Sequence, residues 1–261
     1  MLRFALEFIA HLVKNLSLLI TSAVTPNDPT SVKLNSFEER KFYTLESIKR
    51  WVKLIPNIRL VICDGSNYNF KDDLIASNIN IENIECLAFQ NDDKAVAILG
   101  KGYGESTIIN YSLQYSKLLN EVDYFAKCTG KLVVENFSKV VPLDGDYEHC
   151  FIPNFQWQTN KFSLNLIDID TRFFLVKKTF YLENFTNIYD NKSPNQSIEA
   201  LFLDKLIELE LDHFLFARRP IISGMSGGSG TLYNTKYYRV LKDRLKYFFY
   251  KKSAFYKNFF I

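Results

Sequence analysis

The stretch that decides the fold runs from Gly100 to Val134 and reads GKGYGESTIINYSLQYSKLLNEVDYFAKCTGKLVV. Its first half places Gly102 and Gly104 before apolar residues at three- and four-residue spacing, which predicts a helix with one buried face. The run Tyr124-Phe125-Ala126 then predicts a short buried strand. After it comes Lys127-Cys128-Thr129-Gly130-Lys131, where we expect the chain to leave the sheet.

This stretch also predicts a binding site. Ligands of open α/β sheets bind outside the carboxyl ends of the strands, and the N-terminus of a helix favours phosphate groups. The glycine-rich helix start and the lysines Lys127 and Lys131 at a strand end therefore predict a site for a phosphorylated ligand. The structural alternative is a helix–loop–strand unit whose glycines make a tight turn and whose lysines are solvated, and the stretch alone leaves both open.

The composition is that of a globular α/β protein. Hydrophobic residues make up 47% of the 261 residues and charged residues 23%, which suits one large domain with a full core. The net charge of +3 argues against nucleic-acid binding over the whole surface. Four cysteines stand far apart with no paired spacing, which predicts buried thiols in a reducing cytosol and neither a zinc site nor a disulfide framework.

Basic charge is concentrated at the C-terminal end. Eight of the 32 Lys and Arg residues lie from Lys236 onward, against one of the 29 acidic residues. We therefore expect a single domain over residues 1–235 and an amphipathic basic, aromatic tail over residues 236–261 that contacts an anionic membrane surface. The alternatives are packing against the domain and stacking on nucleic acid, although no RNA-binding motif accompanies the tail.

The N-terminal segment MLRFALEFIAHLVKNLSLLI predicts an amphipathic helix that leads into the first strand. Charged and polar residues, Arg3, Glu7, His11 and Lys14, interrupt its apolar residues too often for a membrane span. No export signal with a cleavage site is recognisable. Packing against the core is the favoured role, and lying on a membrane surface is the alternative.

Elsewhere the chain alternates strands and helices. We expect strands at 16–23, 59–63 and 84–89, and helices at 36–54 and 71–76, the first of them capped by Ser36 with Glu39. This order predicts a parallel, doubly wound sheet. Further on we expect two strands at 151–157 and 162–174 that pair antiparallel, a helix at 197–211 and a flexible glycine/serine loop at 222–230. The first helix is expected to bury Phe37, Phe42, Leu45, Ile48 and Val52.

Four short motifs occur in a fixed order along this layout. They are Lys101-Gly102-Tyr103-Gly104-Glu105, Lys127-Cys128-Thr129-Gly130-Lys131, Asp170-Thr171-Arg172-Phe173-Phe174 and Ser223-Gly224-Met225-Ser226-Gly227. In these motifs and in its layout the chain resembles the GT-A glycosyltransferases, over about residues 16–230. More closely, it is similar to bacterial glycosyltransferases of capsule and lipopolysaccharide assembly. The resemblance implies a GT-A-like (Rossmann-like), mostly parallel sheet with flanking helices, and a transferase that uses a nucleotide-sugar donor.

The resemblance also implies a donor site. Thr21, after the first strand, and Asp64, at the end of the second, take the positions that hold the nucleoside, although Asp64-Gly65-Ser66 is equally suited to a local Asx-turn. Arg172 is a candidate for donor phosphate or an acidic sugar, with a structural ion pair as the alternative. The implied donor-binding residues are Thr21, Asp64, Lys101, Gly102, Gly104, Glu105, Lys127, Thr129, Gly130, Lys131 and Arg172.

The chain departs from the family at the metal-binding motif. Most GT-A enzymes carry Asp-x-Asp at the end of the fourth strand, where this chain has Lys127-Cys128-Thr129-Gly130-Lys131. A lysine neutralises a leaving phosphate without metal coordination, so no metal ligand is assigned. A divalent cation, Mg²⁺ or Mn²⁺, at Asp144-Gly145-Asp146 or at Asp168-Ile169-Asp170 remains the alternative. Asp144-Gly145-Asp146 is also a sequence typical of a turn.

For the catalytic base the resemblance implies Glu199, near the start of the late helix, with Asp170 and Glu105 in reserve. The structural alternative for Glu199 is that it favours the helix dipole. The glycine/serine loop at 223–230 is expected to close over the donor or to act as a mobile connector. Single displacement with inversion is expected, and retention is the alternative.

Taken together, these features predict a cytoplasmic enzyme, peripheral to the inner membrane. Its expected partners are a nucleotide-sugar donor and a glycan or lipid-linked glycan acceptor, and no nucleic acid. The rival interpretation is a non-catalytic nucleotide-binding or scaffold protein in a membrane-associated polysaccharide assembly complex, which the missing Asp-x-Asp motif keeps open.

Overall fold

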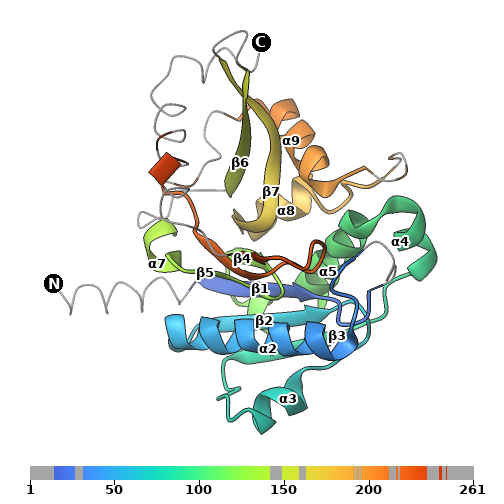
Figure 1. The fold of residues 1–261 in the computed structure, drawn as a ribbon, viewed down its shortest axis with the longest axis vertical. Coiled ribbons are helices and arrows are strands. Elements are labelled where there is room, and N and C mark those ends of the chain that lie inside the picture. Colours follow the sequence, from blue (N-terminus) through green and yellow to red (C-terminus); the bar gives the residue numbers. More distant parts are fainter. Residues whose placement is uncertain are drawn as a thin grey trace, which may run out of the picture.

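The computed structural model describes residues 15–26, 32–141, 149–158, 163–190, 192, 194, 196–211, 216, 218–233, 241, 242 and 245. Over these residues it is an α/β structure with a six-stranded sheet and helices on both of its faces (Figure 1). The strands of this sheet are β1 (Leu16–Ser22), β2 (Arg59–Asp64), β3 (Ile84–Ala88), β4 (Tyr124–Thr129), β6 (His149–Gln158) and β7 (Ser163–Lys177).

The strand order is β3-β2-β1-β4-β7-β6. β1 pairs in parallel with β2 on one side and with β4 on the other, and β2 pairs in parallel with β3. β7 is antiparallel to both β4 and β6, so it alone runs against the other strands. The mostly parallel sheet and the antiparallel pairing of the two late strands confirm the prediction. The order reverses between β1 and β4, which makes their carboxyl ends a topological switch point.

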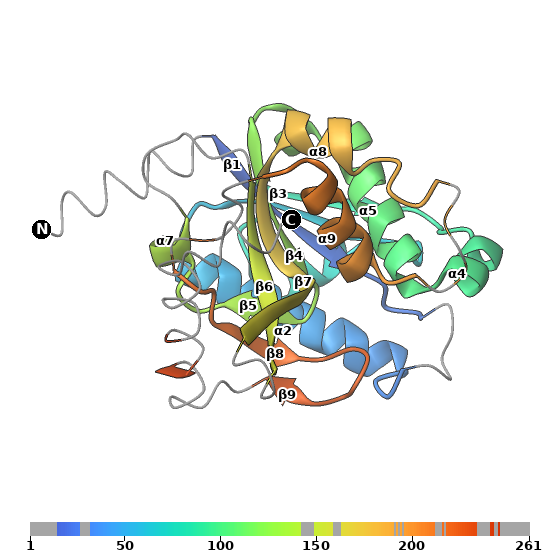
Figure 2. The same ribbon diagram turned by 90° about the horizontal axis from the view of Figure 1, so that it is seen from above.

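Two layers of helices cover the sheet, as the view from above shows (Figure 2). On one face α2 (Phe37–Leu54), α3 (Lys71–Ala76) and α7 (Phe137–Val140) pack on a cluster that includes Leu18, Ile62 and Phe173. On the other face α5 (Lys101–Tyr115), α8 (Lys178–Asn184) and α9 (Ile198–Glu208) pack on an aromatic-rich cluster around Phe174. The remaining helices are α4 (Asp93–Leu99) and α6 (Lys117–Asn120).

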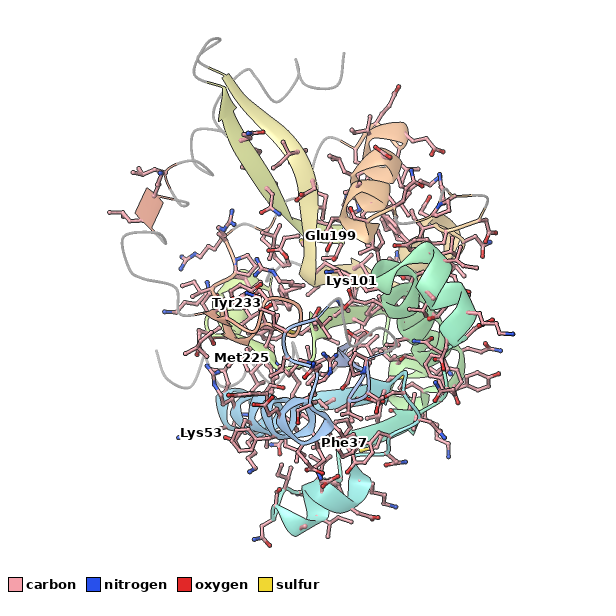
Figure 3. The ribbon with its side chains drawn as sticks, turned by 45° about the vertical axis from the view of Figure 1, so that its right-hand side comes forward. Phe37, Lys53, Lys101, Glu199, Met225 and Tyr233 are labelled. Atoms are coloured by element: carbon pink, nitrogen blue, oxygen red, sulfur yellow. The ribbon has the colours of Figure 1, made fainter. Side chains whose placement is uncertain are left out.

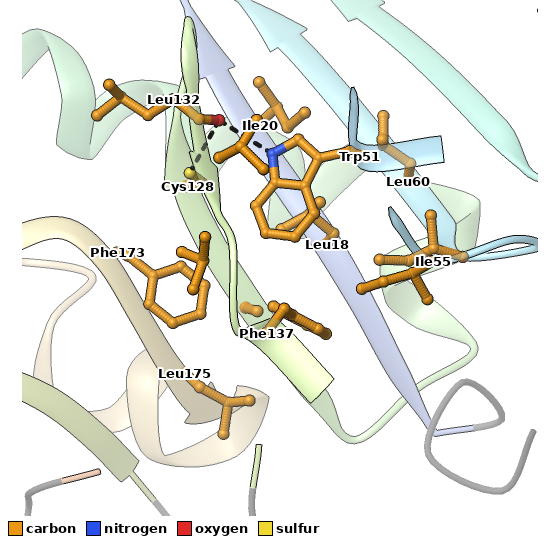
Figure 4. Packing of buried hydrophobic residues seen from close by; sticks show 14 of the residues in the cluster. Leu18, Ile20, Trp51, Ile55, Leu60, Cys128, Leu132, Phe137, Phe173 and Leu175 are labelled. Carbon is orange, nitrogen blue, oxygen red and sulfur yellow. Dashed lines mark hydrogen bonds between the residues drawn. The ribbon is translucent and has the colours of Figure 1, made fainter. Parts of the chain in front are cut away.

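Helix α2 begins as predicted, and its buried face agrees with the prediction in part. The Ser36 side chain accepts a hydrogen bond from the Glu39 N–H, as the capping box required. Phe42 is 56% exposed, so its predicted place in the core is wrong. Ile48 is buried as predicted, and Phe37, Leu45 and Val52 are partly buried against the core. The other buried residues of the helix are Arg40, Thr44, Ser47 and Trp51. The indole of Trp51 fixes this orientation, because its Nε1 donates to the Leu132 carbonyl at 3.0 Å within the core (Figure 4).

In the stretch from Gly100 to Val134, the helix and the strand each include more residues than predicted. Helix α5 begins at Lys101, directly after Gly100 with φ 92°, so Gly102 and Gly104 lie inside its first turn. Strand β4 continues to Thr129, and Lys127 is therefore a fully buried strand residue. The chain leaves the sheet within the predicted motif, after Thr129. Lys127 itself stays inside the sheet, because polar partners inside the fold accept its ammonium group, as shown below.

The glycine/serine segment is a strand over its first half. β8 (Ile222–Met225) pairs with β5 (Leu132–Val134) and with β9 (Leu232–Tyr233) in a small second sheet. A Cβ on Gly224 would lie 2.1 Å from the Lys131 carbonyl oxygen, and its φ is 121°. Gly224 thus allows the close approach of β8 to the end of β4, and the prediction of a flexible loop is wrong for 222–225.

The remaining predictions fall partly outside the described residues. The expected strands at 16–23, 59–63 and 84–89 and the helices at 71–76 and 197–211 are present with ends shifted by up to three residues. The N-terminal helix lies outside the described part of the chain, as does nearly all of the tail at 236–261. Among the described helices none is long and apolar enough to cross a membrane.

Candidate functional site at the carboxyl ends of β1 and β4

The carboxyl ends of β1 and β4 lie side by side at the switch point. Thr21 is in register with Thr129, and the Gly130 N–H donates to the Thr21 carbonyl at 2.7 Å. A Cβ on Gly130 would lie only 2.8 Å from that carbonyl oxygen, so glycine is what lets the two strand ends meet. The turn that follows places Lys131 at a φ of 73°, in the left-handed region.

Side chains from α5, β1 and β4 converge on one carboxylate, that of Glu105. Its Oε1 accepts hydrogen bonds from Lys127 Nζ at 2.5 Å, Thr129 Oγ1 at 2.9 Å and Thr21 Oγ1 at 3.1 Å. Burial alone would raise the pKa of Glu105, but the charge of Lys127 and these hydrogen bonds lower it further than burial raises it. Glu105 is therefore ionised, and its carboxylate holds together the side chains of Thr21, Lys127 and Thr129 at the switch point.

The ammonium group of Lys127 is completely engaged. Besides Glu105 it donates to Thr129 Oγ1 at 2.9 Å and to the Thr171 carbonyl at 2.8 Å, which uses all three of its N–H groups. The side chain is 0% exposed. Lys127 thus ties β4 to α5 and β7. In this structure it presents no N–H group to a ligand, and its predicted contact with donor phosphate stays a prediction.

Glu199, the predicted base, stands in the first turn of α9, whose N-cap Ser197 accepts a hydrogen bond from the Ala200 N–H. The hydroxyl of Thr171 donates to Glu199 Oε1 at 3.2 Å. Because the Thr171 carbonyl accepts from Lys127, one residue connects Glu199 to the cluster at the switch point. Figure 3 shows Glu199 and Lys101 at the starts of α9 and α5.

Gly102 lets the starts of α5 and α9 lie against each other, whereas Gly104 lies against α4. A Cβ on Gly102 would lie 2.3 Å from the Tyr189 Oη and 3.0 Å from the Ile198 N, so only glycine allows α9 to begin here. The corresponding contact of Gly104 is looser, at 3.3 Å from a Val96 methyl group. Both glycines face protein groups in this structure, and their predicted contact with a donor remains untested.

Asp64 orders the loops after β1 and β2. Its Oδ1 accepts from the Ser66 N–H at 2.8 Å and the Ser66 hydroxyl at 2.6 Å, and its Oδ2 accepts from the Val24 N–H at 3.0 Å. The side chain is fully buried. The Asx-turn foreseen as the structural alternative is therefore present, and a role of Asp64 in holding a nucleoside stays a prediction.

Two buried cations lie beside the end of β4. Lys131 is 5% exposed, and burial, together with the neighbouring charge of Arg40, lowers the pKa of its ammonium to about 7 despite the opposing effect of Asp64 and Glu105. Arg40 of α2 donates from Nε to the Ala23 carbonyl at 2.7 Å and from Nη1 to the Leu34 carbonyl at 2.9 Å. Lys101 is exposed.

Arg40 was missed by the sequence reasoning. The available signal was its spacing of four and eight residues from Thr44 and Ile48, which puts it on the buried face of α2. Because Phe42 was assigned to the buried face of α2, Arg40 was not recognised as part of that face.

Asp170 and Arg172 form a separate pair. The Asp170 carboxylate is 4% exposed in its side chain and accepts from the Arg172 backbone N–H at 3.1 Å, from Nε at 2.8 Å and from Nη2 at 2.5 Å. The Arg172 guanidinium lies 4.6 Å from the centroid of the Tyr233 ring of β9. The structural ion pair foreseen for Arg172 is therefore present. The structure brings Glu199, and not Asp170, into the hydrogen-bonded network of the switch point.

The predicted metal alternatives gain no geometric support from the described residues. Asp144 and Asp146 lie outside them. Asp168 accepts a hydrogen bond from Asn154 Nδ2 at 2.6 Å, and no group of three or more His, Cys, Asp or Glu side chains gathers within the described ranges. A divalent metal remains an untested alternative.

Comparison with models of known protein families finds none that matches the chain. Comparison with curated proteins finds no match either.

Proposed function

We propose that the chain is a GT-A-like glycosyltransferase that moves a sugar from a nucleotide-sugar donor to a glycan acceptor in bacterial surface polysaccharide synthesis. The observation that carries the proposal is the convergence of two motifs at the switch point, where Glu105 of the first binds Lys127 and Thr129 of the second. Ligands of open α/β sheets bind at this place. The motifs that carry the resemblance therefore meet where the fold favours a ligand.

Glu199 is the proposed base. The acceptor hydroxyl gives its proton to the Glu199 carboxylate while its oxygen bonds to the anomeric carbon of the donor. The bond from that carbon to the phosphate oxygen breaks, and the nucleotide leaves with the electron pair. The hydrogen bond from Thr171 holds the carboxylate in place, and Lys127 holds Thr171 through its carbonyl. In this assignment Lys127 and Glu105 are positioning residues and do not touch the reacting atoms.

The acceptor and the location follow from the tail. A basic, aromatic segment at 236–261 suits the interface of an anionic bilayer, and a lipid-linked glycan would be presented at such an interface. We therefore propose a cytoplasmic enzyme that is peripheral to the inner membrane.

The test is a transfer assay with a panel of UDP-, GDP-, CMP- and dTDP-linked sugars and a membrane extract that supplies lipid-linked glycans. We expect Glu199→Gln to lower turnover about a hundredfold or more, because general-base catalysis typically contributes that much. Glu208→Gln is the matched control, since Glu208 lies in the same helix with an exposed side chain that pairs with Lys205.

Equal turnover in both variants and the wild type would show that Glu199 is not the catalytic base. Nucleotide binding without transfer by the wild-type protein with any donor would favour the scaffold interpretation.

A further inference from the structure

Strand β3 forms one edge of the six-stranded sheet, and among the described residues none pairs with its outer side. Every residue of the strand is half-buried. Such an edge offers unpaired backbone N–H and C=O groups to another chain. The opposite edge, β6, is protected, because Pro153 and two irregularities in its pairing with β7 disturb that strand. β3 contains neither a proline nor a bulge, so it is the open edge of this sheet.

The backbone groups of β3 that point outward can be identified from its contacts with β2. The Asn83 carbonyl accepts a hydrogen bond from β2 at 2.9 Å, and the Phe89 N–H donates one to β2 at 3.1 Å. Because backbone groups alternate between the two sides of a strand, the odd-numbered residues face β2. Ile84, Cys86 and Ala88 therefore direct their carbonyls outward, and Cys86 and Ala88 direct their N–H groups outward as well. No described residue bonds to these groups.

These outward groups are complementary to themselves. In a second copy of the chain, placed antiparallel across a two-fold axis at Cys86, the Cys86 N–H would donate to the carbonyl of the partner's Cys86, and the reverse. The Ala88 N–H would meet the carbonyl of the partner's Ile84 in the same way. We propose that the protein forms a two-fold dimer in which β3 of one copy pairs with β3 of the other, so that one sheet runs through both. Two-fold contacts of this kind are the commonest in soluble oligomers.

The charges along β3 permit this pairing. Glu85 is the one charged residue of the strand, and its carboxylate is used inside the fold, where it accepts from the Ser116 hydroxyl at 2.6 Å and from the Lys117 N–H at 3.1 Å. In the proposed register Glu85 faces the partner's Leu87. Like charges on directly opposite residues, which would oppose strand pairing, are therefore avoided. The strand also carries none of the lysines that commonly block an open edge.

Apolar side chains flank the edge on both faces of the sheet. On the face of α5, the rings of Phe89, Tyr111 and Tyr115 lie in a row with centroids 4.2 and 4.5 Å apart, and Tyr115 is 53% exposed. On the face of α3, Ile79 and Ile81 are only partly buried. A stable interface buries about 1,200–2,000 Å², which a pair of short strands alone does not supply. A second copy covers both flanks, whereas a single extended peptide would cover the edge alone.

The dimer leaves the candidate site accessible. Across the axis the parallel strands of the two copies run in opposite directions, so the carboxyl ends of β1 and β4 lie toward opposite ends of the dimer. β2 and β3 separate these strand ends from the contact. The inference is therefore independent of the proposed function, and failure of one leaves the other standing.

The experiment is sedimentation velocity of the full-length protein over a dilution series, in which we expect a dimer that dissociates on dilution. Cys86 supplies a second readout, because the other cysteines are buried and paired Cα atoms about 5.5 Å apart lie within the range that a disulfide bridges. Oxidation with copper phenanthroline should link the dimer through Cys86, as detected by non-reducing electrophoresis and peptide mapping. Cys86→Ser should prevent the link and keep the dimer.

Cys86→Pro should raise the dissociation constant of the dimer about tenfold or more, because proline removes the central pair of hydrogen bonds. It should still fold, since the lost N–H faces away from β2. Tyr115→Lys tests the flank without a change in the backbone and should also weaken the dimer. Ile167→Lys is its matched control, because Ile167 is 50% exposed in β7, beside β6 at the opposite edge, and should leave the dimer unchanged.

A protein that sediments as a monomer at every concentration would overturn the proposal. A dimer that Tyr115→Lys leaves as stable as the wild type, and that oxidation does not link through Cys86, would do the same even if Cys86→Pro proved to be unfolded by circular dichroism. A dimer that is weakened by Ile167→Lys and by neither of the other two substitutions would place the contact at the opposite edge and would also refute pairing through β3.

Discussion

At the residue scale, two lysines of one motif have opposite environments. Lys127 donates all three of its N–H groups to protein oxygens. Lys131, four residues later, forms no hydrogen bond or ion pair with its ammonium among the described residues, although the charges of Arg40, Asp64 and Glu105 act on it. The sequence predicted a basic strand end and placed both lysines in the same role. It could not separate them, because the partners of Lys127, Glu105 and Thr171, come from distant parts of the chain and meet only in the folded sheet.

The buried pair of Glu105 and Lys127 should dominate local stability. We expect Glu105→Gln and Lys127→Met each to lower the free energy of unfolding by about 3–5 kcal/mol, since each leaves the other charge buried without its counter-ion. The double variant should lose clearly less than the sum of both. Urea unfolding measures all of these values.

The control is the exposed pair of Glu46 and Lys49, in which each side chain is about 40% exposed. The same replacements there should change stability by about 0.5 kcal/mol or less. Strictly additive losses at Glu105 and Lys127 would show that the two residues do not act as a pair.

At the scale of elements, periodicity located α2, α5 and α9, but tertiary contacts set their ends and faces. The capping signal at Ser36 was sufficient to start α2 correctly. Its buried face was predicted only in part, because Phe42 is apolar yet exposed, while Trp51 is buried and donates a hydrogen bond to Leu132 of β5. The glycines before Glu105 predicted a helix start suited to a phosphorylated ligand or a tight turn, whereas in the structure it is contact with Tyr189 and with Ile198 of α9 that requires Gly102 within the helix.

The contact between the starts of α5 and α9 predicts unequal effects of two similar substitutions. Gly102→Ala should destabilise the protein by about 1–3 kcal/mol, because its methyl group meets Tyr189 and the backbone of Ile198. It should also lower turnover, since α9 carries Glu199. Gly104→Ala, with its looser contact, should be near neutral, because alanine gains about 1 kcal/mol of helix propensity over glycine.

Thermal unfolding and transfer assays of the two variants check this difference. Equal melting temperatures of Gly102→Ala and Gly104→Ala would contradict the role of Gly102 in placing α9.

At the scale of the whole molecule, the order of strands and helices was enough to predict the mostly parallel sheet and a site at the carboxyl ends of its strands. The alternation of β-α units leaves few ways to arrange such a sheet. The small sheet β5-β8-β9 was not foreseen, because its strands have two to four residues and β5 pairs with β8 across about ninety positions of sequence. This second sheet carries the glycine turn at residues 226–230 to the candidate site. The site was therefore predictable in place but not in composition, and Arg40 emerged only from the fold.

The most direct test of the central claim is hydrogen–deuterium exchange of the whole protein with and without the nucleotide-sugar of the panel that raises the melting temperature most. A ligand at about a hundred times its dissociation constant stabilises the folded state by roughly 2.7 kcal/mol, which is ample for the selection. We predict protection of residues 22–25, 129–131 and 226–230, the segments around the carboxyl ends of β1 and β4 and the glycine turn. Stabilisation with protection elsewhere and none in these three segments would contradict a donor site at the switch point.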